Sequence, residues 1–399
     1  MEILYFSIAG ADTIIENKRK DRLSQDLNGF FKKVHYVLLE ESSYKPHVQT
    51  LDNPVYEVVF LSNKRFKSLN HGWLRHIDTL VSYFLNIFYL LMYIKKNNIS
   101  IIFSQDPFIM GTVSYLLSAI FHLPYVIEVC SNYKVRYWKE NKRAIPIFHS
   151  VRLEKTIFYF VLKHAHAVIA DRDNYWNDGV IPHSIGSKYY RYHFSMEEAH
   201  YKLPEQRTNL KPFYKAENKK VVLYIGRLHP DKRSEDLVPF AEHLFKRHNF
   251  NNTEMWIVSW DSPLKRKVIN KIVEMGLSDV VKFIDNQPTA KVADFLYTAD
   301  VVIAPHAGWI IPECQLAQTP IVVYDFEWQR EGVVDGKYGI LVPYRDAKAM
   351  ADAAVDILSH EDKYKDMTRQ ARQYVLDNNT FEQEIEDKLH IFKRVLGKE

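Results

Sequence analysis

Short apolar runs alternate with longer segments of helical periodicity along the first half of the chain. The segments at residues 80–95 and 151–164 repeat their apolar positions with the period of a helix, whereas the short runs have the length of buried strands. Strand, helix and strand at this spacing predict βαβ units and a parallel sheet. The strands are expected at residues 2–8, 34–39, 55–61, 99–103, 125–129 and 167–170.

A second series of the same kind follows a polar segment at residues 186–219, and residues 381–396 predict a final amphipathic helix. Two such series predict an α/β chain with two doubly wound, Rossmann-like domains that face a cleft, with ligands at the carboxyl ends of the strands. We place these domains at residues 1–190 and 191–380, followed by a C-terminal helix at residues 381–399. The second set of strands is expected at residues 221–225, 255–259, 280–284, 301–304, 321–324 and 339–342.

The composition is that of an ordinary globular protein, because 47% of the 399 residues are hydrophobic and 26% are charged. The formal net charge of +4 arises in the first half, where residues 1–200 contain 24 Lys and Arg against 19 Asp and Glu. This excess is too weak to indicate nucleic acid binding. It fits an anionic partner, such as a phospholipid surface or a pyrophosphate-linked acceptor, and equally an ordinary solvated surface.

Cysteine usage and apolar stretches predict a cytoplasmic protein. Cys130 and Cys314 have no zinc or redox spacing, which favours a reducing compartment. Residues 1–10 lack the charged region and the long apolar core of a signal peptide. The longest apolar stretch, residues 80–94, is too short to span a bilayer, so we expect a buried helix, with a helix seated in a membrane interface as the alternative.

The first chemical cluster directly follows the expected strand at residues 221–225. Gly226 permits a tight turn, and Ser234 is a suitable N-cap for the next helix. Arg227 and Lys232 therefore lie on a strand-to-helix loop, where a guanidinium fork and an ammonium group can neutralise a diphosphate. A solvated basic loop of no special function has the same composition.

The second cluster follows the expected strand at residues 301–304. A loop with Gly308 leads to a helix that we expect to begin near Pro312, because proline favours the first helical position. Glu313 in the first turn suits hydrogen bonding to paired ribose hydroxyls, with a merely helix-stabilising glutamate as the alternative. Backbone N–H groups at this N-terminus would form an anion site. They belong to Trp309, Ile310 and Ile311.

Together these clusters resemble the retaining GT-B glycosyltransferases of family 4, the glycosyl transferases group 1. Residues 225–228, followed by Lys232, are similar to the donor loop of that family. Residues 299–342 are similar to its signature region. This region has a proline, a glycine-containing loop and a glutamate at a helix start. A small residue and a proline before a strand follow, here at residues 317–323. Residues 331–342 are close to the pattern E-x-V-x-D-G-x-x-G-x-L-V. The resemblance is strong over residues 220–375 and weaker in the first half.

The resemblance implies a GT-B fold with the donor in the second domain and the acceptor in the first. It implies transfer of a sugar from a nucleotide-diphospho-sugar with retention of configuration, in cell-surface polysaccharide or glycolipid biosynthesis. No metal or other cofactor is expected, because cations and a helix N-terminus stabilise the leaving diphosphate. Arg227 and Lys232 would hold the diphosphate, and Glu313 the ribose. Further donor contacts are expected from Gly226, Asn286 beside the base, His306, Gly308, Trp309, Ile310 and Ile311.

Two positions depart from the family pattern. The family usually has two glutamates with seven residues between them; Glu313 is the second, and Pro305 occupies the first position. Either His306 or the Gly308 loop is therefore expected to cover the donor sugar. The family often has a histidine where Cys130 stands. We place the acceptor near three residues of the first domain: Gly10, Cys130 and Asn132.

Other interpretations stay open. A GT-B epimerase or phosphorylase shares the fold. An epimerase would need an acid and a base in the cleft, and a phosphorylase a cofactor lysine, and neither is evident in the sequence. A non-catalytic sugar-nucleotide-binding partner of another transferase is a further alternative, because the first glutamate is missing. Residues 171–173 form a D-x-D pattern, with His164 and His166 nearby, that could bind a metal; we consider this the weaker interpretation.

Basic and aromatic residues are interleaved at residues 133–139, followed by Lys142 and Arg143, and residues 64–67 form a second basic cluster. Aromatic rings beside cations suit a membrane interface or a phosphorylated acceptor, and an exposed loop is the simpler alternative. We therefore expect a glycan or lipid-linked acceptor, and peripheral binding to an anionic membrane surface on the inner face of the cell membrane.

Overall fold

The computed structural model consists of two compact units, Met1–His193 with Glu382–Glu399, and Phe194–Phe381. The turn with Gly10 and the basic cluster at residues 64–67 lie outside the described residues. The structure describes residues 1–8, 14, 26–40, 45–62, 73–145, 148–196, 201, 207–250 and 252–398.

The first unit is built on a sheet with the strand order β3-β4-β2-β1-β5-β6-β7-β8. Neighbouring strands are parallel except β3 and β4, which form an antiparallel pair. The inner strands are apolar on both faces, as expected for a parallel sheet that is covered on both sides. The strands are β1 Glu2–Phe6, β2 Lys33–Glu40, β3 His47–Thr50, β4 Tyr56–Ser62, β5 Ile99–Ser104, β6 Tyr125–Glu128, β7 Ala167–Ala170 and β8 Tyr189–Arg191.

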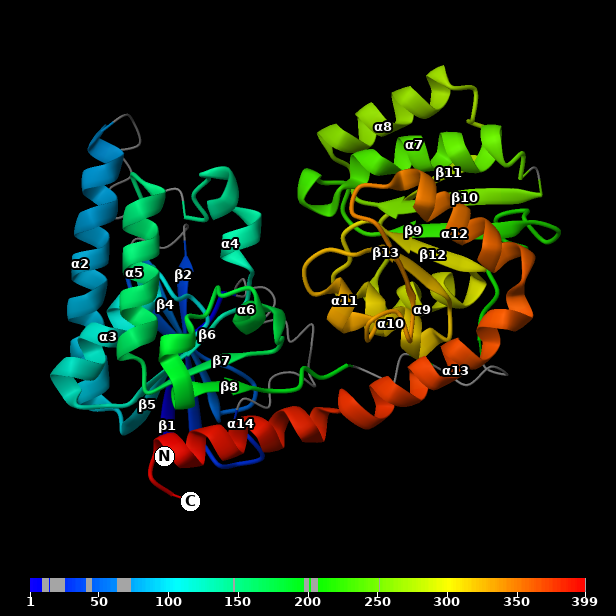
Figure 1. Cartoon of the computed structure of the whole chain (residues 1–399). Helices are drawn as coiled ribbons and strands as arrows, with labels where there is room; N and C mark the ends of the chain where they lie inside the picture. Colours follow the sequence, from blue (N-terminus) through cyan, green and yellow to red (C-terminus); the bar gives the residue numbers. More distant parts are fainter. Residues whose placement is uncertain are drawn as a thin grey trace. The chain divides into compact units, whose positions relative to one another are not determined.

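Three helices cover one face of this sheet side by side (Figure 1): α2 (Trp73–Lys96), α3 (Ile109–Phe121) and α5 (Val151–His164). Each helix connects two parallel strands, and the second strand always lies further toward the β8 edge of the sheet than the first. Right-handed crossovers therefore put all three helices on one face. Shorter helical segments are α4 Tyr133–Arg136, η2 Trp138–Glu140, α6 Asn174–Asn177 and η3 His183–Lys188.

The last helix, α14 (Phe381–Val395), packs within the first unit. The ring of Phe392 lies 5.4 Å from that of Phe31 and 5.8 Å from that of Phe103, between centroids. All three side chains are buried. Residues from the two ends of the sequence therefore share one hydrophobic core.

The second unit has a wholly parallel sheet with the order β11-β10-β9-β12-β13-β14. Helix α7 contacts α8 and α12 on one face, and helix α10 contacts α9 and α13 on the other. The strands are β9 Lys220–Ile225, β10 Thr253–Ser259, β11 Val281–Asp285, β12 Val301–Ala304, β13 Ile321–Tyr324 and β14 Ile340–Val342. The helices are α7 Leu237–Glu242, α8 Pro263–Glu274, α9 Thr289–Thr298, α10 Ile310–Ala317, α11 Gln329–Gly332, α12 Ala347–Ser359 and α13 Glu361–Asn378.

The predicted α/β class with two parallel sheets is confirmed, and every strand expected from an apolar run is present. The sequence did not predict β3 or β8. The helix expected near Pro312 begins two residues earlier, at Ile310. None of the described helices combines the length and the apolar character needed to cross a membrane.

Phe392→Ala tests whether α14 is part of the first core. Loss of a buried phenylalanine costs about 3–5 kcal/mol, so we expect a clearly lower unfolding temperature in calorimetry. Phe213→Ala is the matched control, because the Phe213 side chain is 78% exposed and should change stability by less than about 0.5 kcal/mol. Equal unfolding temperatures for the two variants would contradict this packing.

Candidate functional site

Two neighbouring strands of the second sheet lead to the two clusters predicted from the sequence. β9 and β12 are parallel neighbours, with Val222 opposite Val301. The chain leaves β9 toward α7 on one face of the sheet and leaves β12 toward α10 on the other. The carboxyl ends of β9 and β12 therefore form the switch point at which doubly wound sheets bind ligands.

The loop after β9 is held by two buried hydroxyl groups. The hydroxyl of Tyr224 donates to the carbonyl oxygen of Arg227 (2.9 Å), and Oγ of Ser234 accepts from the N–H of His229 (3.2 Å). Burial raises the pKa of Tyr224 to about 12, so this hydroxyl stays protonated and able to donate. Gly226, with φ of 149°, adopts a backbone conformation that other residues rarely adopt. These hydrogen bonds fix the backbone of Arg227 at the start of the loop.

Lys232 brings the two predicted clusters together. It ends a single turn of 3-10 helix, η6 (Pro230–Lys232), and a Cβ atom placed on Gly308 would lie only 3.3 Å from the Lys232 Nζ atom. The buried ring of His306 joins the same loops, since Nδ1 is hydrogen-bonded to the carbonyl oxygen of Asp231. The absence of a side chain at Gly308 therefore lets the lysine amine lie against the loop after β12.

Buried polar side chains also fix the loop after β12. The side-chain oxygen of Gln329 accepts from the N–H of Ala307, and its Nε2 donates to the carbonyl oxygen of Tyr324 (2.9 Å). Nε2 of His306 lies 3.3 Å from Oε2 of Glu327, which is itself buried. Sequence reasoning missed Gln329 and Glu327, which follow the next strand, β13, and carry no local signal.

The helix after this loop, α10, presents its N-terminus at the carboxyl end of β12. Trp309 is the N-cap residue, and the N–H of Glu313 donates to its carbonyl oxygen (3.2 Å). The N–H groups of Ile310 and Ile311 lie in the first turn, where helix geometry provides no intrahelical acceptor. Glu313 is half-buried in the same turn. This arrangement suits a ligand with one anionic and one hydroxylated part.

Asn286 stands apart from this group in the sheet order. It directly follows β11 and is exposed, and β10 separates β11 from β9. The structure thus brings Arg227, Lys232, His306 and the start of α10 to adjacent strand ends. The expected contact of Asn286 with the base stays a prediction.

Cys130 and Asn132 of the first unit follow β6. Burial, together with the Glu128 carboxylate, raises the pKa of the Cys130 thiol well above its usual value, so this thiol is protonated. Asn132 is buried; its oxygen accepts from the N–H of Val135 (3.1 Å) and its Nδ2 donates to Oδ2 of Asp178 (2.6 Å). Asn132 therefore holds α4 in place through both ends of its amide.

A buried polar cluster that sequence reasoning missed lies beside Cys130. Glu128, the last residue of β6, accepts hydrogen bonds from Nε2 of Gln105 (2.9 Å) and from the hydroxyl of Tyr192. Nζ of Lys388, on α14, lies 2.5 Å from Oε1 of Glu384 and 4.5 Å from the centre of the Tyr192 ring. Burial alone would lower the pKa of Lys388, but Glu384 and Glu128 raise it, so the amine keeps its charge.

This polar cluster lies at the switch point of the first sheet. β1 and β5 are parallel neighbours, and the N–H of Gln105 donates to the carbonyl oxygen of Phe6 at the end of β1 (3.0 Å). The one sequence signal for this cluster was Glu128, a charged residue at the end of an apolar strand. The other members come from loops and from α14, far away in the chain.

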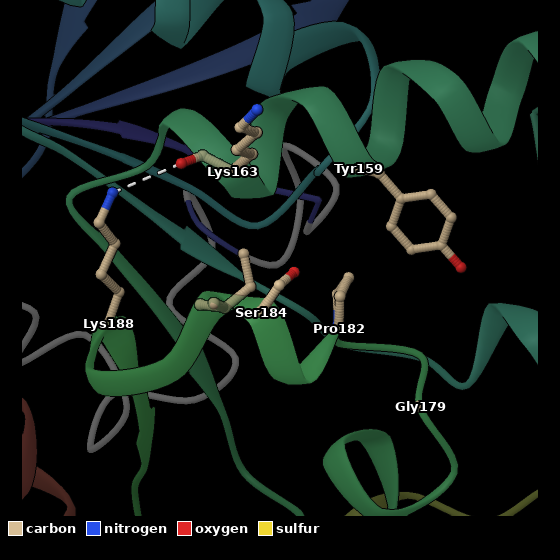
Figure 2. A pocket seen from close by; sticks show the side chains of 7 residues that line it. Tyr159, Lys163, Gly179, Pro182, Ser184 and Lys188 are labelled. Atoms are coloured by element: carbon tan, nitrogen blue, oxygen red, sulfur yellow. Dashed lines mark hydrogen bonds between the residues drawn. The ribbon is translucent and has the colours of Figure 1, made fainter.

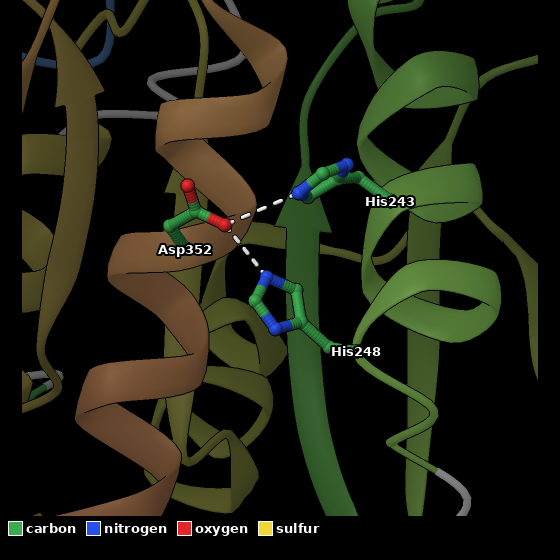
Figure 3. A group of neighbouring side chains, drawn as sticks. All are labelled: His243, His248 and Asp352. Atoms are coloured by element: carbon green, nitrogen blue, oxygen red, sulfur yellow. Dashed lines mark hydrogen bonds and ion pairs between the residues drawn. The ribbon is translucent and has the colours of Figure 1, made fainter.

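The structure does not form the metal site that the D-x-D pattern suggested, but it brings together another group of side chains that could hold an ion. The carboxylates of the D-x-D pattern pair with arginines instead, Asp171 with Arg172 (3.4 Å) and Asp173 with Arg191 (3.2 Å). In the part of the chain that the structure describes, one cluster of side chains has its possible metal-binding atoms within 4.8 Å of one another (Figure 3). It consists of His243, His248 and Asp352.

This three-residue cluster lies away from the switch point. His243 and His248 flank a π-helical turn, and both Nε2 atoms contact Oδ1 of Asp352 on α12, at 3.2 and 2.6 Å. Hydrogen bonds from the two rings lower the pKa of Asp352 despite some burial of this carboxyl, which by itself raises it. The cluster therefore links α12 to the helical turn that follows α7 through hydrogen bonds.

Part of the chain is similar in sequence to a known family. Residues 205–374 match the family described as glycosyl transferases group 1. The D-inositol 3-phosphate glycosyltransferase of Corynebacterium urealyticum is 31% identical over 163 residues, which cover 39% of this chain and 38% of that protein. The chain thus matches less than half the length of such curated relatives.

Solved structures match over the full length. Sucrose-phosphate synthase from Thermosynechococcus elongatus superposes with a TM-score of 0.77 at 16% identity and covers 100% of both chains. Anabaena HepE, solved in complex with UDP and glucose, has a TM-score of 0.72 at 14% identity, over 99% of this chain and 100% of that one. The two parallel-sheet units therefore have the fold of the GT-B glycosyltransferases.

The match to the glycosyl transferases group 1 family covers residues 205–374, the part of the chain that contains both clusters of the second unit. The family resemblance predicted from the donor-loop and signature motifs is confirmed.

Ser234→Ala tests how far the loop after β9 depends on one hydroxyl. The change leaves the N–H of His229 and the buried hydroxyl of Tyr224 with one partner fewer, so we expect a loss of about 1–3 kcal/mol in unfolding free energy. Urea denaturation measures it, with Ser187→Ala, at an exposed position of the first unit, as the control. A loss no larger than in the control would show that the loop does not rely on Ser234.

Proposed function

We propose that this protein is a retaining glycosyltransferase that moves a sugar from a nucleotide-diphospho-sugar to an acceptor. The observation that carries the proposal is the contact between Lys232 and Gly308, which joins the basic loop after β9 to the loop that leads into α10. A lysine, an arginine and a helix N-terminus then meet at one switch point, which suits a diphosphate.

In the proposed reaction, the diphosphate is the leaving group. Arg227 and Lys232 offset the negative charge that grows on it as the bond to the sugar breaks, and the N–H groups of Ile310 and Ile311 add a fixed dipole. Glu313 accepts hydrogen bonds from the ribose hydroxyls. Charge stabilisation of this kind needs no metal ion. UDP in the HepE structure makes a uridine nucleotide the first donor to test.

His306 is proposed to replace the missing first glutamate of the family pattern. It follows Pro305 directly, and its ring is fixed between the carbonyl oxygen of Asp231 and the carboxylate of Glu327. A ring fixed on both sides beside the diphosphate site is suited to contacting the donor sugar, because little conformational entropy is lost on binding.

The acceptor is proposed to bind in the first unit near the switch point of its sheet. Gln105, Glu128 and Cys130 lie there, and the bonds among them are suited to orient a hydroxyl-rich ligand. We infer a glycan or lipid-linked acceptor, in cell-surface polysaccharide or glycolipid biosynthesis. The second candidate function is a non-catalytic donor-binding partner, which Pro305 at the first glutamate position favours.

The experiment that tests the donor is a thermal-shift screen of nucleotide sugars. A donor that binds only the folded protein raises its unfolding temperature. Released nucleotide is then measured without acceptor, because many transferases hydrolyse their donor slowly. Stabilisation with slow release of nucleotide supports an enzyme, and stabilisation without release supports the binding partner. No stabilisation by any nucleotide sugar contradicts both.

Arg227→Ala and Lys232→Ala are each expected to lower turnover by about 10²-fold or more, because each removes a preorganised charge beside the leaving group. Unfolding temperatures should stay near that of the wild type. Lys267→Ala on α8 is the matched control, because Lys267 is exposed and lies outside this site. Wild-type turnover in either site variant would remove that residue from the proposed mechanism.

Activity is expected to persist in EDTA, because the proposed site stabilises the diphosphate with cationic side chains and backbone N–H groups. Initial rates are compared with EDTA and with added Mg²⁺ or Mn²⁺. A rate that is lost in EDTA and restored by either ion would contradict the proposed stabilisation of the leaving group.

A further inference from the structure

The outer helices of the first unit expose large apolar side chains to an unusual degree. On α2, Phe84 is 73% exposed and Phe88 59% exposed, and together with Met92 they follow one another at every fourth residue. Residues at this spacing form one stripe along a helix. Exposed apolar side chains continue on the two neighbouring helices: Leu116 and Ile120 on α3, and Leu153 and Phe160 on α5.

The three helices that carry these side chains cover the same face of the sheet (Figure 1). α3 and α5 are in direct contact. The Tyr115 ring of α3 lies 4.9 Å from the Phe160 ring and 5.3 Å from the His164 ring, both on α5. We call this surface, formed by the exposed residues of α2, α3 and α5, the apolar-basic face.

The charge on the apolar-basic face has a single sign. The sequences of the three helices contain only two acidic residues, Asp78 and Glu154, and these are 4% and 0% exposed. Glu154 is used internally, where it accepts a hydrogen bond from the indole N–H of Trp138 (2.6 Å). Exposed cations are present at the ends of α2 and α5. They are Lys95, Lys96, Arg152 and Lys163.

A pocket of about 440 Å³ opens beside this face (Figure 2). Tyr159 and Lys163 of α5 line it from one side, and Ser184 and Lys188 of η3 from the other. Lys188 reaches across and donates to the carbonyl oxygen of Lys163 (3.4 Å), which keeps its amine at the end of α5. The amines of Lys163 and Lys188 point in different directions in Figure 2, so they add two separate positive charges beside the apolar-basic face.

We propose that the first unit docks on an anionic phospholipid bilayer through the apolar-basic face. Phe84, Phe88 and Met92 enter the interfacial region, as apolar side chains of interfacial helices do. The cations at the helix ends meet the anionic headgroups. This docking needs no nucleotide sugar and no acceptor, so it stands apart from the proposed glycosyl transfer.

The charges favour a bilayer over other partners. A second copy of the chain placed on this face by two-fold symmetry would bring lysines against lysines, which is unfavourable. A phospholipid surface supplies both phosphates for the cations and acyl chains for the phenylalanines. The basic and aromatic segment at residues 133–139, expected from the sequence to make this contact, does not present its tryptophan, since Trp138 is 5% exposed and packs on Phe158.

The test is sedimentation of the full chain with vesicles of phosphatidylcholine, with and without phosphatidylglycerol, at low and high salt. We expect binding only to the anionic vesicles, weakened by salt, because the attraction is screened beyond about one Debye length. Replacing both lysines, Lys163→Gln with Lys188→Gln, is expected to lower the partition coefficient about 30-fold, at about 1 kcal/mol for each cation. Phe84→Ser with Phe88→Ser should lower it about 10-fold or more.

Matched controls lie on the second unit. Lys267→Gln with Lys271→Gln removes two exposed charges from α8, and Phe213→Ser removes an exposed ring, so neither should change vesicle binding. Unfolding temperatures establish that all variants fold. The proposal is overturned if the wild type ignores anionic vesicles at low salt, or if the controls weaken binding as much as the test variants.

Discussion

The pairing of β9 with β12 is the constraint on which the second unit depends. Because these strands are neighbours while their helices leave to opposite faces, two loops from distant parts of the sequence end at one place. Hydroxyls of Tyr224 and Ser234 and the amide of Gln329 then fix both loops with buried hydrogen bonds. Buried polar bonds are costly to leave unmade, so each loop has few alternative conformations. The lysine at one loop and the glycine at the other meet as a consequence.

The fold was predictable where buried strands leave short apolar runs in the sequence. Strands such as β7 and β12 are buried on both faces, so every residue in them is apolar and the run is visible without any partner. β3 is exposed throughout and β8 is only half-buried, so neither leaves a hydrophobic pattern. The start of α10 was misplaced by two residues because Pro312 is tolerated throughout a first turn, not only at its first position.

The candidate site was predictable where its residues are adjacent in the chain, as in Arg227 with Lys232. The remaining partners are set by tertiary packing. His306 contacts Glu327 across a strand and a helix, and Glu128 is joined by Tyr192 and by Lys388 from helices and loops far along the sequence. No local sequence pattern predicts such contacts. The apolar-basic face was hidden for a related reason, because periodicity shows which residues share a side of a helix but not whether that side is covered.

Packing of α14 on the first unit has a consequence for the order of events during synthesis. Residues 382–399 belong to the unit that begins at Met1, so the second unit is an insertion within the first. A ribosome releases every residue of the second unit before it releases Phe392 and Lys388. Until then Phe31 and Phe103 lack a ring that covers them, and Glu128 lacks a nearby cation. The unit encoded first is therefore the one that completes its core last.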